Sequence, residues 1–215
     1  MPDIWHTLKQ WPELMLERLA DAGVARIVLN RPEKRNCWNR SLCNAFLEAL
    51  DLIRADKELK VVITKGAGTV YSSGLDLNFL REVSNGPILD WDRPNLTIQI
   101  AEDLRAFPRI MIAQVHGYCL GGALGIISQA VPAEQLEAHT TAMAREIASR
   151  HLAPLEHHKI TVQMGRDLSL SQAIKLDQLV GARMRRAMDP LGDVEGYLKS
   201  QKGGANLNYK RPDVR

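Results

Sequence analysis

Residues 115–123 read VHGYCLGGA, and this stretch decides the fold that the sequence predicts. It continues an apolar run at 110–115 (IMIAQV) that predicts a buried strand. The pair Gly121-Gly122 then begins a predicted helix. A helix N-terminus offers unpaired N–H groups and a dipole that favours negative charge, and glycine lets a ligand approach the backbone closely. Glycine-rich turns also follow strands in many α/β proteins, so this stretch alone indicates only an α/β unit.

The residues before this stretch alternate between strand and helix signals. Short β-branched runs predict strands, and apolar residues at helical spacing predict helices. The strands are expected at 24–30 (VARIVLN) and 61–64 (VVIT), and the helices at 41–55, 75–83 and 96–107. Asn39 or Ser41 is a possible N-cap of the first helix. These recurring strand-then-helix units favour an α/β architecture.

The residues after Pro132 carry no strand signal. Amphipathic helices are predicted at 134–150, 154–164 and 169–187. The end of the chain, residues 199–215, is polar, basic and glycine-rich, which is typical of a tail that is mobile or ordered by a partner.

The bulk composition fits an ordinary globular protein. The 215 residues are 45% hydrophobic and 25% charged, with a formal net charge of +3 and scattered charges. A nucleic-acid partner would need a concentrated basic patch, so none is expected. Three cysteines without a CxxC pair suggest neither a disulfide framework nor a zinc site. No membrane span or signal peptide is expected, and the predicted location is cytoplasmic.

Four segments appear together in an order that resembles the crotonase superfamily, the enoyl-CoA hydratase/isomerase family. They are residues 29–36 (LNRPEKRN), 70–77 (VYSSGLDL), 115–123 (VHGYCLGGA) and 127–136 (ISQAVPAEQL). Each motif alone is weak, but four in order cover nearly the whole chain. The resemblance implies a spiral of strand–strand–helix units followed by a C-terminal helical region. It also implies an enzyme that binds an acyl-CoA and stabilises a thioester enolate in a backbone oxyanion hole.

The resemblance also assigns candidate site residues. The backbone N–H groups of Ser73 and Gly122 would form the oxyanion hole, in which one donor is typically worth about 3 kcal/mol. The CoA moiety would lie against two segments, at Lys34, Arg35 and Asn36 and at Leu75, Asp76 and Leu77. Asp76 is interpreted as structural, as a helix cap, and Lys34-Arg35 as either phosphate neighbours or a solvated turn. No metal or further cofactor is implied, and a homotrimer or hexamer is expected.

Other polar and aromatic residues are interpreted structurally. His116 is expected to be a packed histidine, the pair His157-His158 a surface pair rather than metal ligands, and Cys119 a small packed residue. Trp38 and Trp91 could line an acyl pocket, but large aromatic residues belong to cores first.

The sequence departs from the family pattern at the position of the general acid and base. Family hydratases use two glutamates, one of them three residues after the paired glycines, where this chain has Gly125. Between Leu124 and Ile127 the chain passes directly to the stretch that precedes the C-terminal helices. Either the protein is naturally short here, or residues of a longer product are missing from this sequence. The predicted organisation is an α/β core at 1–131 that lacks an internal block near 124–127, a helical region at 132–198 and a basic tail at 199–215.

This departure leaves alternatives to hydration and isomerisation open. Other crotonase-type acyl-CoA chemistry, such as thioester or C–C bond hydrolysis, would use the same oxyanion hole. A scaffold that binds CoA or RNA without catalysis is the rival from another class. If the chain is complete, we expect negligible hydration of crotonyl-CoA, because nothing would deliver a proton or activate water.

Overall fold

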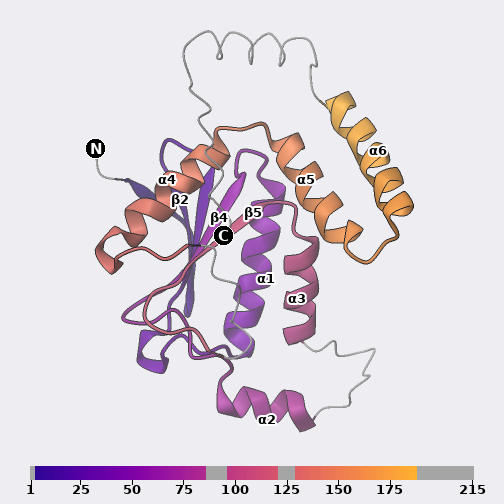
Figure 1. The fold of residues 1–215 in the computed structure, drawn as a ribbon. Coiled ribbons are helices and arrows are strands. Elements are labelled where there is room, and N and C mark those ends of the chain that lie inside the picture. Colours follow the sequence, from indigo (N-terminus) through magenta and orange to yellow (C-terminus); the bar gives the residue numbers. More distant parts are fainter. Residues whose placement is uncertain (1–2, 86–95, 121–128, 188–215) are drawn as a thin grey trace, which may run out of the picture.

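A five-stranded sheet lies at the centre of the protein (Figure 1). The computed structural model describes residues 3–85, 96–120 and 129–187. The strands follow each other in sequence order across the sheet. They are β1 (Trp5–Trp11), β2 (Leu14–Leu19), β3 (Val24–Leu29), β4 (Val61–Gly66) and β5 (Ile110–Gln114). The first three are antiparallel neighbours, whereas β3, β4 and β5 run parallel. Parallel neighbours need crossover connections, and helices supply these here.

Helices cover both faces of the sheet. Those before β5 are α1 (Arg40–Ala55), α2 (Leu77–Asn85) and α3 (Leu96–Ala106), with a short 3-10 turn at Pro32–Lys34. Those after β5 are α4 (Leu136–Ala148), α5 (Leu152–Gly165) and α6 (Leu170–Ala187), with a 3-10 turn at Ala133–Gln135. In Figure 1, α1 and α3 lie on one side of the sheet and α4 on the other.

The larger core lies between α1 and the sheet. Residues of α1 at helical spacing are buried, among them Leu42, Phe46 and Ile53. They pack against side chains of β2 and β3, and Phe107 at the end of α3 completes this core. Asn39 caps α1, since its side chain accepts a hydrogen bond from Leu42 N at 2.8 Å. The sequence left Asn39 and Ser41 open as caps, and this bond identifies Asn39.

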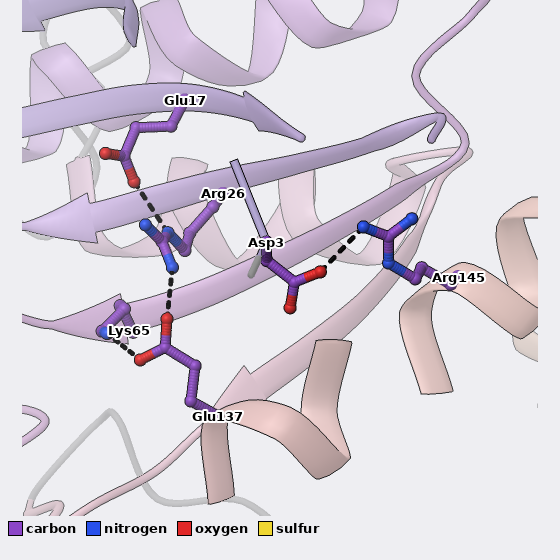
Figure 2. Close-up of polar contacts among 6 residues, drawn as sticks. All are labelled: Asp3, Glu17, Arg26, Lys65, Glu137 and Arg145. Carbon is purple, nitrogen blue, oxygen red and sulfur yellow. Dashed lines mark hydrogen bonds and ion pairs between the residues drawn. The ribbon is translucent and has the colours of Figure 1, made fainter. Parts of the chain in front are cut away.

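The opposite face of the sheet is covered by α4. Ala144 and Ala148 of α4 pack against Leu19, Val24, Val61 and Ile63. Charged side chains flank this smaller core (Figure 2). The guanidinium of Arg26 bonds to Glu17 at 2.7 Å and to Glu137 at 2.9 Å, and Lys65 bonds to the same Glu137 carboxylate at 3.1 Å. The ammonium of Lys60 donates to the carbonyls of Ala148 and Arg150, which caps the end of α4.

Most of the predicted elements are confirmed within a few residues. The expected helices and strands correspond to β3, α1, β4, α2, α3, β5, α4, α5 and α6. The hairpin of β1 and β2 was not predicted. The predicted tail at 199–215 lies outside the described residues. Among the described residues, no helix combines the length and hydrophobicity that a membrane span requires.

Candidate active site

The site predicted from the sequence centres on a turn between β4 and α2. Ser72 is fully buried, and its hydroxyl fixes this turn to the loop after β3 by donating to Asn36 O at 2.9 Å. The turn continues through Gly74, whose φ of 89° lies in a region that side-chain-bearing residues rarely adopt. Asp76 then caps α2, because its side chain accepts a hydrogen bond from Asn78 N at 3.0 Å. The structural interpretation of Asp76 as a helix cap is therefore confirmed.

The loop after β3 is organised around the side chain of Asn36, which is fully buried. Its amide oxygen accepts from Arg31 N at 3.0 Å, and its amide nitrogen donates to Ala67 O at 2.8 Å and to Val70 O at 2.9 Å. Arg35 and Asn36 both have φ of 53°, so the chain turns sharply here. Asn36 thus joins the loop after β3 to the loop after β4, and as a direct CoA contact it stays a prediction.

Two of the backbone bonds between the loop after β3 and the turn are made by Trp38. Trp38 N donates to Gly74 O at 2.8 Å, and Asp76 N donates to Trp38 O at 2.8 Å. This parallel bridge pairs Trp38 with Leu75 and leaves the N–H of Leu75 without a partner among the described residues. The N–H of Ser73, by contrast, donates to Arg35 O at 2.9 Å. The sequence pointed to Ser73 as a donor; among the described residues, Ser73 N is bonded to Arg35 O, whereas the N–H of Leu75, two residues later, has no partner.

The end of β5 brings the second predicted half of the site to the turn. Tyr71 N donates to His116 O at 2.9 Å, and Leu120 N donates to Ser72 O at 3.1 Å. Gly117 permits this approach, since a Cβ there would lie 2.4 Å from Thr69 O and the residue has φ of 60°. Residue 120 therefore lies beside the turn. Gly122, the second predicted donor, lies outside the described residues.

Charged groups surround the bridge on its inner side. The buried guanidinium of Arg31 donates to Cys37 O at 2.7 Å and lies 3.7 Å from the carboxylate of Asp76. The N–H of Asn78 lowers the pKa of Asp76 most, with smaller contributions from the Cys37 thiol and Arg31. Burial raises the pKa of Cys37, and the hydrogen bond of its thiol to Asp76 adds to this rise. A carboxylate with a lowered pKa that is engaged in this way is a poor general base.

The remaining predicted CoA contacts are open to solvent. Lys34 and Arg35 are exposed, Leu77 is 72% exposed, and Leu75 is half-buried. The ammonium and guanidinium of Lys34 and Arg35 have no partner among the described residues, which leaves both cations available for a phosphate. A shallow pocket of about 340 Å³ borders the turn on the α1 side, lined by Asn39, Asp76, Phe79 and Glu82 among others.

Comparison with known proteins tests the family resemblance. Residues 20–124, about half of the chain, match the family model described as enoyl-CoA hydratase/isomerase. This part of the chain belongs to the enoyl-CoA hydratase/isomerase family. The match contains the loop after β3, the turn and the segment that leads to Gly121-Gly122, so three of the four resembling segments lie within it.

Curated members of the family cover a range of reactions. A hydroxycinnamoyl-CoA hydratase-lyase of Pseudomonas fluorescens is 32% identical over 116 residues, 53% of this chain and 41% of that protein. The mitochondrial Delta(3,5)-Delta(2,4)-dienoyl-CoA isomerase of Mus musculus is 30% identical over 118 residues, 51% of this chain and 36% of that protein. The chain thus spans less than half the length of the curated family members that it matches.

Solved structures confirm the predicted crotonase fold. An enoyl-CoA hydratase from Bacillus anthracis superimposes with a TM-score of 0.72 at 17% identity, covering 88% of this chain and 96% of the other. One from Mycobacterium smegmatis gives 0.73 at 18% identity, covering 88% and 97%. The described sheet and helices, including the helical region after β5, agree with this fold class.

Several other interpretations can be compared with the structure. The imidazole of His116 bonds to Gly68 O at 3.0 Å, and Trp38 packs edge-on against Phe46 of the core. The surface interpretation of His157 was wrong, because its side chain is buried between α5 and α6 and lies 3.0 Å from the carboxylate of Asp177. Within residues 3–85, 96–120 and 129–187, no group of three His, Cys, Asp or Glu side chains could hold a metal ion.

Proposed function

We propose that this protein acts on acyl-CoA thioesters and polarises the thioester carbonyl with backbone N–H groups at the turn between β4 and α2. The observation that carries the proposal is the N–H of Leu75, which has no partner in residues 3–85, 96–120 and 129–187 and lies between two backbone bonds to Trp38. A donor that is fixed before the ligand arrives costs no reorganisation when negative charge develops on the carbonyl oxygen.

The second donor in this proposal is Gly122. Its support is the bond from Leu120 N to Ser72 O, which brings residue 120 beside the turn. Gly122 is the second residue after Leu120, so the chain can reach the same carbonyl oxygen. The exposed cations of Lys34 and Arg35 are proposed to attract the phosphates of CoA, with Leu77 and Asp76 at the edge of the same turn.

The proposed reaction is hydration or isomerisation of an enoyl-CoA, which is the chemistry named for the family. The curated relatives include a hydratase-lyase and dienoyl-CoA isomerases, so other crotonase-type reactions are the first alternative. We propose no metal or redox cofactor, because an enolate held by backbone donors needs none.

Replacing single amides by esters tests which N–H is used. The α-hydroxy analogue of leucine at position 75 deletes that N–H alone. We expect kcat to fall about 10²–10³-fold on whichever substrate is turned over, the usual cost of one oxyanion donor. The matched control is the α-hydroxy analogue of serine at position 73. It removes the bond to Arg35 O and should lower stability while kcat changes less than about tenfold. A large loss of kcat for the ester at position 73, with little loss for the ester at position 75, would assign the donor role to Ser73 instead.

The substrate panel follows from the relatives. Crotonyl-CoA, a dienoyl-CoA and a hydroxycinnamoyl-CoA should be assayed with the same protein, and binding of CoA and acetyl-CoA measured by calorimetry. Turnover of at least one thioester is the expected result. The absence of both turnover and binding at millimolar ligand would refute the proposal.

A binding protein without catalysis is the second candidate function. It is favoured by the state of Asp76, the only carboxylate of the turn itself, which is engaged by Asn78 N and Arg31. Saturable binding of acyl-CoA without turnover of any panel member would select this candidate. RNA binding would instead appear as a salt-dependent shift with an RNA oligomer, which we do not expect.

Exposed apolar side chains on α5 and α6 support a proposal about assembly. Leu170 and Leu179 of α6 are 77% and 72% exposed, and Val162 of α5 is 66% exposed, which supports a homotrimer or hexamer formed through these helices. Light scattering at micromolar concentration tests this, and a monomer would refute it. A cytoplasmic location remains a proposal.

A further inference from the structure

We propose that Arg31 is a positioning residue that fixes the orientation of the Leu75 N–H. This inference rests on the proposed function, since it concerns the donor assigned there. Arg31 is the second residue after β3 and is only 8% exposed, although arginine side chains normally stay at the surface. Desolvating a guanidinium is costly unless its partners compensate, so its contacts indicate what the buried charge stabilises.

The guanidinium contacts both strands of the bridge that carries Leu75. Its Nη1 donates to Cys37 O at 2.7 Å, directly before Trp38. Its Nη2 lies 3.7 Å from Oδ2 of Asp76, directly after Leu75. Trp38 in turn holds Gly74 O and Asp76 N, the backbone groups on either side of Leu75. Arg31 therefore contacts both segments of the bridge, next to Trp38 and next to Leu75. These contacts fix the orientation of the peptide group that contains the Leu75 N–H.

A third contact anchors Arg31 to the sheet. Its Nε lies 2.8 Å from Oε1 of Glu13, which directly precedes β2; this is an ion-pair contact without the geometry of a hydrogen bond. The same oxygen accepts from Asn39 Nδ2 at 3.1 Å, and Asn39 caps α1. The guanidinium is thus held between a carboxylate on the sheet side and a carboxylate on the turn side. The planar guanidinium of Arg31 therefore fixes the orientation of the turn relative to β2 and α1.

Only the planar guanidinium of arginine can contact Glu13, Cys37 O and Asp76 at the same time. Lysine has one nitrogen on a flexible stem and can satisfy the sheet side or the turn side but not both with the same geometry. The proposal therefore predicts that Arg31→Lys keeps the charge and most of the stability but loses part of the positioning. Arg31→Gln should lose both the charge and the positioning.

The test compares three variants with the full chain. We expect Arg31→Gln to lower kcat about 10–100-fold, the range that a donor misplaced by about 1 Å produces, with KM changed less than about threefold. Arg31→Lys should lie between wild type and Arg31→Gln. The matched control is Arg18→Gln, which removes a half-buried arginine of β2 whose 3.3 Å ion pair with Asp56 is separate from the turn. It should leave kcat within about twofold.

A spectroscopic readout separates positioning from a general loss of structure. The ¹³C resonance of a carbonyl-labelled acyl-CoA should move downfield on binding to wild type, because the oxygen accepts hydrogen bonds. We expect Arg31→Gln to bind the thioester with similar affinity and to lose most of this shift. The same readout applies if wild type binds the thioester without turning it over.

Asp76→Asn provides a second route if Arg31→Gln does not fold. Asparagine can still cap α2, since it accepts a bond from Asn78 N, but it no longer attracts Arg31. Both kcat and the ¹³C shift should fall as in Arg31→Lys. A full shift and unchanged kcat in folded Arg31→Gln, or in folded Asp76→Asn, would overturn the positioning role while leaving the proposed function intact. Failure of wild type to bind or turn over any thioester would overturn both.

Discussion

Replacement of Asn36 by alanine should destabilise the protein more than any single change at its surface. The side chain is fully buried and makes three hydrogen bonds to the backbone, to Arg31 N, Ala67 O and Val70 O. Asn36→Ala leaves one N–H and two carbonyls without these partners. An unsatisfied buried group costs about 1–3 kcal/mol, and water can reach Ala67, which is only half-buried.

The backbone adds a smaller contribution to this loss. Asn36 has φ of 53°, a left-handed conformation that asparagine tolerates better than alanine, which pays about 1 kcal/mol there. The three lost bonds and the backbone together amount to roughly 4 kcal/mol. Since domains of this kind unfold with about 5–15 kcal/mol, the variant should retain only part of its stability.

Urea unfolding followed by tryptophan fluorescence measures this difference. The control is Asn44→Ala, because Asn44 lies on the exposed side of α1 and the change should stay within about 0.5 kcal/mol. A loss below about 1 kcal/mol for Asn36→Ala would show that the three bonds contribute little and that our account of the loop is incorrect.

The near-isosteric change Asn36→Asp tests the direction of the same bonds. The new carboxylate could still accept from Arg31 N, but it would face two carbonyl oxygens that lie 2.8 and 2.9 Å from the present amide nitrogen. Its pKa in the folded state should therefore rise above the unfolded value. A raised pKa contributes stability at low pH that is lost as the pH rises through it. Equal destabilisation at pH 4 and pH 8 would contradict this reasoning.

Three further predictions concern the packing of α4 on the sheet and the buried thiol of Cys43. Lys60→Met removes the ammonium that caps the carbonyls at the end of α4, and hydrogen exchange in α4 should accelerate while that in α1 does not. Burial raises the pKa of Glu137, but Lys65 and Arg26 outweigh it and the net pKa is lowered. The attachment of α4 should therefore be complete above the unfolded pKa of Glu137 and weaken as the pH falls through the folded value; Glu137→Gln should remove this pH dependence of the unfolding midpoint. Burial raises the pKa of Cys43 to about 11, so alkylation at pH 8 should be at least tenfold slower in the folded chain than in urea, as peptide mass spectrometry can measure.

Much of the fold could be predicted because its signals are local. Strand β3 has six consecutive buried residues, and α1 buries residues at helical spacing, so both follow from hydrophobic pattern alone. The hairpin of β1 and β2 gave a weaker signal. Strand β1 is exposed along five of its seven residues, so it has no buried face to produce an alternating pattern. The turn at Trp11-Pro12 was the available hint.

The site was predictable only to the level of the segment. The motifs pointed to the loop after β3 and to the turn, but they could not show which N–H lacks a partner among the described residues. That depends on the bridge between Trp38 and Leu75 and on the bond from Ser73 N to Arg35 O, which join residues far apart in sequence. The burial of His157 was missed for the same reason, since it depends on how α5 and α6 pack.

The position of α4 has a consequence for synthesis of the chain on the ribosome. All five strands leave the ribosome before the helix that covers their second face, because α4 begins at Leu136 and β5 ends at Gln114. During this interval Leu19, Val24 and Ile63 face water, and Arg26 lacks the carboxylate of Glu137. We expect nascent chains stalled before α4 to bind chaperones and to be cleaved readily by protease. Chains stalled well after α4 should resist both, so the helix that covers the second face of the sheet decides when the molecule escapes quality control.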